Sequence, residues 1–203
     1  GIIVVSPDTS PRGEDVPDDP DYGYGQGAGF YLDATQEPWS EHFKMYSYIL
    51  KDLLSAVESN FPADMKRLGV FGHSMGGHGA LTIAFKNPEL FKSVSVFSPI
   101  CAPTKAPWGE KAFARYLGED TNLWQDYDAC DLVRAKGWPN DILIDQGEDD
   151  EYLADHLKPE LLEQACEEKG VAIKFRKHAG YDHSYFFVST FIGDHILWHS
   201  ERL

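Results

Sequence analysis

The chain has 203 residues, with 18 lysines and arginines against 33 aspartates and glutamates, so its formal net charge is −15. Apolar residues make up 42% of the sequence, which is typical of a folded protein and too apolar for a disordered one. The negative charge disfavours nucleic acid as a partner, because phosphate backbones would be repelled. No run of 18 apolar residues is present, so we expect no segment that spans a membrane.

The first residues, Gly1-Ile-Ile-Val-Val-Ser6, predict a buried strand that runs directly into a loop. A domain seldom begins with a buried strand, and no initiator methionine precedes this one. We therefore expect a chain that lacks its N-terminal portion, with any targeting signal upstream of Gly1. Residues 6–38 are polar and rich in Asp, Gly and Pro, which predicts a flexible, turn-rich loop. Its glycines do not form a dinucleotide fingerprint, because Ala28 and Phe30 interrupt the spacing.

The rest of the chain alternates between strand and helix patterns. Apolar periodicity, β-branched runs and glycine or proline stops predict strands at 67–71, 93–97, 141–145 and 171–176, and helices at 39–59, 78–86, 158–169 and 185–203. This alternation predicts an α/β fold with a mainly parallel sheet and helices on both faces. No linker, repeat or low-complexity tract divides the sequence, so we expect one domain over 1–203.

A G-x-S-x-G motif lies between a predicted strand and a predicted helix, as Gly72-His73-Ser74-Met75-Gly76. In this context the motif predicts a sharp turn that exposes a nucleophilic serine above the N-terminus of a helix. We expect that only glycine fits at both Gly72 and Gly76, because neighbouring elements approach closely there. The free N–H groups there, that of Met75 among them, favour the negative charge that develops during acyl transfer. The alternative interpretation is a structural Gly-Ser turn.

A nucleophilic serine needs a base, and the base needs an acid that orients it. After such a motif the chain order is Ser, acid, His, with the acid beyond a later strand. His183, in the loop before the last helix, is the predicted base, and His178 is the alternative. Asp150 is the predicted acid in the loop after strand 141–145, with Asp149 second, whereas Asp145 ends the strand and is expected to point into the sheet.

Metal sites are not expected from the spacing of potential ligands. His195 and His199 lie four residues apart on a predicted helix, which suits a metal, but no third ligand is near and a solvated helix face is favoured. The three cysteines, Cys101, Cys130 and Cys166, are widely spread and contain no Cys-x-x-Cys pair. A reducing compartment is the simplest interpretation, and it predicts a cytoplasmic protein.

Several longer segments resemble the S-formylglutathione hydrolase family, also called esterase D. They are Pro7-Asp-Thr-Ser-Pro-Arg-Gly13, Gly27-Ala-Gly-Phe-Tyr-Leu-Asp-Ala34, Met45-Tyr-Ser-Tyr48, Phe71-Gly-His-Ser-Met-Gly-Gly-His-Gly-Ala-Leu81, Pro107-Trp-Gly109, Ile142-Leu-Ile-Asp-Gln-Gly147 and Gly180-Tyr-Asp-His-Ser-Tyr185. The resemblance implies an α/β-hydrolase fold whose first strands, and a loop that supplies a second oxyanion donor, precede Gly1.

The resemblance also implies a function. The family triad falls on Ser74, Asp150 and His183, and the reaction is hydrolysis of S-formylglutathione to glutathione and formate, the last glutathione-dependent step of formaldehyde detoxification. No metal or organic cofactor is required. Activity on small acyl esters is typical of the family, and a homodimer is compatible with it. The alternatives are a general short-chain carboxylesterase or acyltransferase with the same triad, and a non-catalytic hydrolase-like binding protein.

Binding of the formyl group and of glutathione requires further residues. Trp108, His73 and Met75 are candidates for the walls of a small acyl pocket. The carboxylates of glutathione need cationic or amide partners, because burial of a bare carboxylate is costly. Arg12, Lys105 and Lys111 are the candidates for this role.

Overall fold

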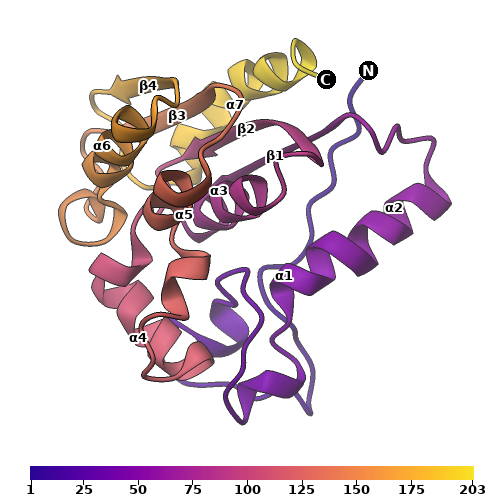
Figure 1. The fold of residues 1–203 in the computed structure, drawn as a ribbon, viewed down its shortest axis with the longest axis vertical. Helices are drawn as coiled ribbons and strands as arrows, with labels where there is room; N and C mark the ends of the chain where they lie inside the picture. Colours follow the sequence, from indigo (N-terminus) through magenta and orange to yellow (C-terminus); the bar gives the residue numbers. More distant parts are fainter.

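A computed structural model describes all of residues 1–203, and a parallel sheet of four strands forms its centre (Figure 1). The strands are β1 (Leu68–His73), β2 (Phe91–Phe97), β3 (Ile142–Gly147) and β4 (Ile173–His178), and they pair in chain order. Because every pair is parallel, the carboxyl ends of all four strands meet at one edge of the sheet. This arrangement confirms the predicted α/β class and parallel sheet.

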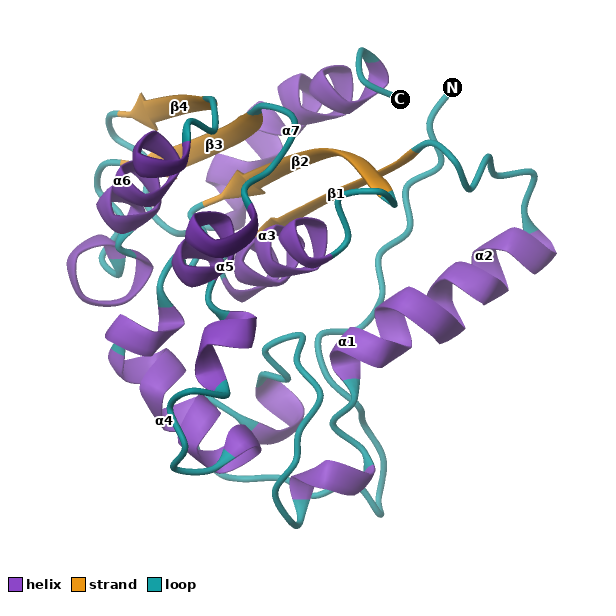
Figure 2. Ribbon diagram, viewed as in Figure 1, coloured by secondary structure: helices purple, strands orange, loops and turns teal.

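Helices cover both faces of the sheet. The helices are α1 (Met45–Ser47), α2 (Leu54–Asn60), α3 (Met75–Lys86), α4 (Pro107–Leu117), α5 (Ala129–Lys136), α6 (Pro159–Lys169) and α7 (Tyr185–Ser200). One face is covered by α3, α5 and α6, and the other by α7 (Figure 2). Two of these helices, α4 and α5, were not predicted from the sequence. No helix combines the length and the apolar character needed to cross a bilayer.

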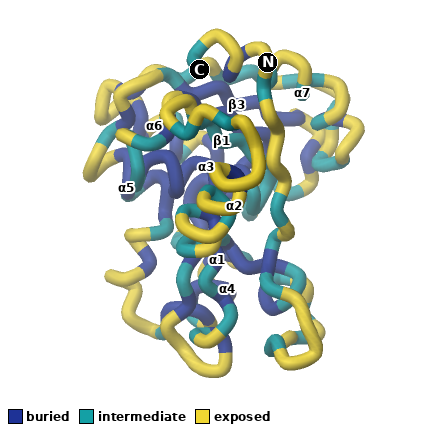
Figure 3. Tube along the Cα trace, turned by 90° about the vertical axis from the view of Figure 1, so that its right-hand side faces the viewer, coloured by how far each residue is buried: buried dark blue, intermediate teal, exposed yellow.

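The buried apolar side chains form two clusters. Figure 3 marks the buried positions along the chain in dark blue. The first, here called the sheet core, lies between the sheet and α3, α5 and α6; its members include Leu81, Phe85, Val94, Ile142 and Leu162. The second, here called the loop core, packs the N-terminal loop against α4; its members include Phe30, Leu32, Trp39, Phe113 and Tyr116. The first cluster stabilises the strands, and the second fixes the segment that leads to the first helices.

The prediction of a strand at residues 2–5 is wrong. These residues form no β-bridge, and Ile3, Val4 and Val5 are 48%, 55% and 42% exposed. The hydrophobic run alone suggested a strand, but a strand also needs a neighbour for its N–H and C=O groups.

The polar segment 6–38 is a loop, as predicted, but it is firmly attached. The Tyr116 hydroxyl accepts a hydrogen bond from Gly25 N–H at 2.7 Å and donates one to the Ala28 carbonyl at 2.8 Å. Phe30 and Leu32 are almost fully buried in the loop core. The expected flexibility of this loop is therefore wrong. The segment is polar on average, but a few aromatic and aliphatic side chains within it are buried and attach it to α4.

The predicted helix 39–59 is divided into shorter pieces. A 3₁₀ turn at Trp39–Glu41 comes first, and α1, a π-helical stretch at Tyr48–Leu53 and α2 follow. The closing helix was placed correctly, but its face was not. His195 and His199 were expected in solvent, whereas they are 0% and 3% exposed and point at the sheet.

Candidate active site

A strained turn joins β1 to α3 at Ser74. The residue has φ 58° and ψ −118°, a conformation that side-chain-bearing residues rarely adopt. The turn is held because Ser74 N–H donates to the Phe97 carbonyl at 2.9 Å and the Ser74 carbonyl accepts from His78 N–H at 3.0 Å. Ser74 therefore lies at the carboxyl edge of the sheet, directly before the N-terminus of α3, where the G-x-S-x-G motif predicted it.

The two motif glycines differ in how much they are needed. A Cβ atom at Gly72 would lie 2.2 Å from the Gly76 carbonyl oxygen, so only glycine fits there. A Cβ atom at Gly76 would meet nothing closer than the Tyr31 hydroxyl, at 4.0 Å. The turn thus brings the backbone of Gly76 so close to Gly72 that no Cβ atom fits at Gly72. The prediction that both glycines are sterically required is wrong for Gly76.

The structure brings Ser74, His183 and Asp150 together from three separate connections at the same edge. His183 Nε2 lies 2.8 Å from Ser74 Oγ, and His183 Nδ1 lies 2.6 Å from Asp150 Oδ2. An ionised Asp150 can only accept a hydrogen bond, so Nδ1 carries the proton. Nε2 is then free to accept the proton of the Ser74 hydroxyl, which is the arrangement that nucleophilic catalysis requires.

Asp150 is a buried carboxylate that is held on both oxygens. Tyr152 N–H donates to Oδ1 at 2.9 Å, and Gln146 Nε2 donates to Oδ2 at 3.2 Å. Burial alone would raise the pKa of Asp150, but the hydrogen bonds from His183 and from Tyr152 N–H outweigh it and lower the pKa below its usual value. The group is therefore ionised at neutral pH and holds His183 in one tautomer.

The alternative acids and the alternative base lie elsewhere. Asp145 forms a two-pronged ion pair with Arg176, at 2.5 and 2.6 Å, on the sheet itself. Asp149 is exposed. His178 Nε2 lies 3.4 Å from Asp145 Oδ1 and is not in contact with Ser74. Of the candidates that the sequence left open, only His183 contacts Ser74, and only Asp150 contacts His183.

Two aromatic rings flank the His183 imidazole. The His73 ring centroid is 4.5 Å away, and the Tyr152 ring lies edge-on at 5.0 Å. Burial and the nearby charge of His183 lower the pKa of His73 to about 4, so His73 is neutral at physiological pH. A neutral neighbour does not repel the imidazolium that His183 would become.

An aromatic wall extends from this pair toward α4. The Trp108 ring stacks on His156 with centroids 3.9 Å apart and lies 4.7 Å from the Tyr152 ring. Trp108 is thus linked to the triad through Tyr152, and its role in an acyl pocket stays a prediction. Met75 is half-buried beside the loop core. On the other side, Tyr185 is 80% exposed and packs against His73, with centroids 5.7 Å apart.

The predicted cationic partners for glutathione do not form a patch. Arg12 pairs with Asp8 at 2.7 Å, and Lys111 pairs with Asp21. Lys105 is exposed and forms no ion pair. No group of three or more His, Cys, Asp or Glu side chains is arranged to hold a metal ion.

Sequence reasoning missed Gln146 and Tyr152, which hold and flank the acid–base pair. A signal was available for both, because Gln146 ends a buried strand with a polar side chain and Tyr152 follows the acid by two residues. Neither signal is specific without the fold. A buried amide or a tyrosine in a loop has many structural uses.

Comparison with known proteins places the chain in a family. The family model described as "Esterase" matches residues 1–198. The S-formylglutathione hydrolase of Paracoccus denitrificans (strain Pd 1222) is 54% identical over 203 residues, which are 100% of this chain and 72% of that protein. The chain belongs to the S-formylglutathione hydrolase family. The rat (Rattus norvegicus) member is 50% identical over 206 residues, covering 100% of this chain and 73% of its own length.

Solved structures agree with this family and with the α/β-hydrolase fold that it implies. The S-formylglutathione hydrolase of Agrobacterium tumefaciens superimposes with a TM-score of 0.94 at 54% identity, covering 96% of this chain and 71% of that one. A fluorophosphonate-binding serine hydrolase of Staphylococcus aureus shares the fold, with a TM-score of 0.68 at 22% identity, over 84% of this chain and 67% of its own. As a member of the S-formylglutathione hydrolase family, the chain is a hydrolase, and the resemblance found in the sequence is confirmed.

Proposed function

We propose that the protein hydrolyses S-formylglutathione to glutathione and formate, with Ser74 as nucleophile, His183 as general base and acid, and Asp150 as the orienting carboxylate. The observation that carries the proposal is the unbroken contact chain from Ser74 Oγ through His183 to Asp150, at 2.8 and 2.6 Å. The relatives named for this reaction, at 50% and 54% identity, support the choice of substrate.

The first half of the reaction forms an acyl-enzyme. Ser74 Oγ attacks the formyl carbonyl carbon while His183 Nε2 takes the hydroxyl proton. The imidazolium that results is stabilised by Asp150, which is already ionised. The tetrahedral oxyanion is stabilised by the N–H group of Met75, the first residue of α3, since the first N–H groups of a helix have no intrahelical partner.

Collapse of the tetrahedral intermediate breaks the C–S bond, and His183 Nε2 gives the proton that it took from Ser74 to the departing sulfur. Glutathione leaves readily because a thiol is a far stronger acid than an alcohol, and His183 is then neutral again. Water then enters, and His183 takes one of its protons as the oxygen attacks the formyl-serine. The second collapse releases formate and returns the proton to Ser74. The C–S bond is broken, one water is consumed, and the protein ends unchanged.

The selectivity that we propose comes from the aromatic wall. Tyr152 lies edge-on to the His183 ring, and Trp108, the second residue of α4, packs on Tyr152, while Met75 packs on the same loop core. A small formyl group fits beside such a wall more easily than a longer acyl chain. We further propose that the reaction serves formaldehyde detoxification in the cytoplasm, a compartment that the three free, buried cysteines suit.

The direct test replaces Ser74 by alanine. Ser74→Ala should lower kcat for S-formylglutathione by about 10⁴-fold or more, because removing the nucleophile leaves only binding and oxyanion stabilisation. Ser189→Ala, an exposed serine on α7, is the matched control and should retain full activity. Turnover by Ser74→Ala at the rate of the control would rule out the proposal.

A second measurement addresses the substrate. Rates on S-formylglutathione and on p-nitrophenyl acetate, compared side by side, distinguish a formyl thioesterase from a general short-chain esterase with the same triad. The proposal expects the higher kcat/KM for S-formylglutathione. A preference for the acetate ester would leave the triad intact and overturn only the substrate.

A further inference from the structure

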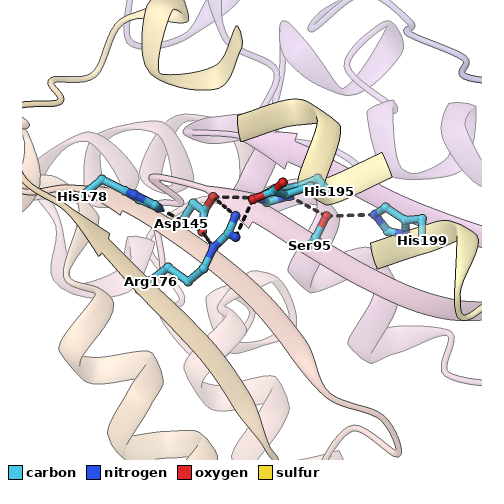
Figure 4. Close-up of polar contacts among 7 residues, drawn as sticks. Ser95, Asp145, Arg176, His178, His195 and His199 are labelled. Atoms are coloured by element: carbon cyan, nitrogen blue, oxygen red, sulfur yellow. Dashed lines mark hydrogen bonds and ion pairs between the residues drawn. The ribbon is translucent and has the colours of Figure 1, made fainter. Parts of the chain in front are cut away.

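A second polar network lies on the opposite face of the sheet from α3, beneath α7 (Figure 4). It joins Ser93 and Ser95 of β2, Asp145 of β3, Arg176 of β4, and His195 and His199 of α7, and we call it the α7 relay. Five of these six residues are no more than 3% exposed, and Arg176 is partly exposed. The triad described above does not use any of them.

The hydrogen bonds of the relay run in one direction, toward Asp145. Arg176 donates to both carboxylate oxygens, and His195 Nε2 approaches Oδ2 to 3.2 Å. Burial opposes the charge of Asp145, but its contacts with His195 and Arg176 lower its pKa to about 2, so the carboxylate is ionised. His195 Nε2 therefore carries a proton toward it, and Nδ1 is the accepting nitrogen of a neutral ring.

The remaining contacts follow from this assignment. Ser95 Oγ–H donates to His195 Nδ1 at 2.8 Å, and Ser95 Oγ in turn accepts from His199 Nε2–H at 2.9 Å. His199 Nδ1 then accepts from the Ser93 hydroxyl at 2.6 Å. Burial lowers the pKa of both histidines, which agrees with neutral rings. Three of the four ring nitrogens take part in hydrogen bonds, and the fourth, His195 Nε2, faces the Asp145 carboxylate at 3.2 Å, so the network favours a single arrangement of α7 on the sheet.

Ser95, His195 and Asp145 repeat the residue types of the triad, but they do not form a second active site. Ser95 is 0% exposed, so no acyl group can reach its hydroxyl. The His195 ring also stacks on Phe97 with centroids 3.7 Å apart, which closes the remaining side. The relay therefore acts on the structure and not on a substrate.

The relay holds both ends of the connection that carries His183. This connection covers residues 179–184, between the end of β4 at His178 and the start of α7 at Tyr185. Arg176, near the end of β4, pairs with Asp145 and also with Asp194 of α7 at 2.6 Å. A shift of α7 along the sheet would therefore pull directly on the segment that carries the imidazole.

The same connection rests on an aromatic layer that belongs to α7. The Tyr181 ring packs against Phe187 and Phe191, with centroids 5.6 and 5.1 Å away, and the His178 ring lies 3.9 Å from Phe191. Tyr181 also holds the loop that carries Asp150, since Asp149 N–H donates to the Tyr181 carbonyl at 3.0 Å. The position of α7 thus affects both the loop that carries His183 and the loop that carries Asp150.

We propose that Asp145 is a positioning residue for the hydrolytic reaction, which through Arg176 and His195 fixes α7 on the sheet and so holds the His183 imidazole between Ser74 and Asp150. The inference rests on the proposed function of that triad. Asp145 does not touch the reacting atoms. Its effect arises because a misplacement of about 1 Å in a catalytic group can cost about 100-fold in rate.

The experiment compares kcat and KM of three variants with those of the parent protein, using p-nitrophenyl acetate as substrate. Asp145→Asn removes the charge that Arg176 and His195 share, and Ser95→Ala is a milder change that removes only the hydroxyl between His195 and His199. Asp128→Asn is the matched control. It alters another buried carboxylate, the N-cap of α5 on the opposite face of the sheet, which has no contact with the His183 connection.

Asp145→Asn should lower kcat by about 10-fold or more per folded molecule, with KM little changed, because transition-state alignment suffers and ground-state binding does not. Ser95→Ala should lower kcat in the same direction by a smaller factor, again with KM little changed.

A purely structural relay would give a different result. Asp145→Asn and Ser95→Ala would then lose stability toward urea as Asp128→Asn does, while kcat per folded molecule stayed at the parent value. That outcome would overturn the proposal, and Ser95→Ala decides if Asp145→Asn does not fold. Failure of the proposed function is separate, because it is seen as turnover by Ser74→Ala.

Discussion

The contacts of Asp150 allow a sharp prediction for Asp150→Asn. The carboxylate accepts from His183 and Gln146 on Oδ2 and from Tyr152 N–H on Oδ1. An asparagine offers one accepting oxygen and one donating NH₂ group. With the NH₂ group at the Oδ2 position it faces two donors, and with the NH₂ group at Oδ1 it faces the Tyr152 N–H.

The consequence for His183 is a change of tautomer or of position. If the NH₂ group faces His183, Nδ1 becomes the acceptor, Nε2 carries the proton, and Ser74 loses its base. If the NH₂ group faces Tyr152 N–H instead, the loop that carries the acid must move. The equivalent substitution in serine proteases costs ~10⁴-fold in kcat through the wrong tautomer. We expect a loss of the same order here, ~5.4 kcal/mol in transition-state free energy.

The assay is kcat/KM on S-formylglutathione at pH 7 and above. Asp149→Asn is the matched control, because Asp149 is the neighbouring carboxylate and is exposed. It should keep activity within about twofold of the parent protein. The reasoning would be refuted if Asp150→Asn retained activity within tenfold of the parent, or if Asp149→Asn lost as much as Asp150→Asn.

Two further predictions concern the turn and the buried histidines. Gly72→Ala should prevent correct folding or abolish activity, because its Cβ would lie 2.2 Å from the Gly76 carbonyl oxygen. Gly76→Ala should leave the fold intact, because a Cβ atom there has room. Equal urea midpoints for the two variants would contradict this expectation. Burial lowers the pKa of His73, His78 and His199 to about 4. The unfolded chain therefore binds protons first, so the free energy of unfolding should fall as pH decreases from ~6.5 to ~4, by up to ~4 kcal/mol per pH unit for three groups. Urea midpoints at pH 7, 6 and 5 measure this slope, which His78→Gln should reduce by about one proton; a flat profile in the parent would disprove it.

The sequence predicted the elements that combine local signals with a fixed rule. Ser74 could be identified because the motif itself describes a strand, a sharp turn and a helix. His183 followed because chain order and the shared carboxyl edge of parallel strands limit where a base can lie. The choice of Asp150 over Asp149 was harder, since adjacent residues have the same local environment. Only the course of the loop backbone makes Asp150 a buried carboxylate that accepts three hydrogen bonds and leaves Asp149 exposed.

The parts that could not be predicted depend on contacts between distant residues. His195 and Ser95 are 100 positions apart, and the spacing of His195 and His199 alone suggested a wet helix face. Nothing in the local pattern shows that Ser93 and Ser95, on a buried strand, will form hydrogen bonds with both imidazole rings. The segment 2–5 is the opposite case, in which hydrophobicity predicted a strand but no other part of the structure pairs with these residues.

The site lies where the sheet core and the loop core meet. Strand β1, which leads to Ser74, packs on the sheet core through Val70, whereas Met75, Trp108 and Tyr152 pack on the loop core. The strand that carries the nucleophile is thus anchored in one cluster, and the side chains proposed to contact the acyl chain are anchored in the other. Exchange of Trp108 can therefore alter substrate preference without displacing the strand that presents Ser74.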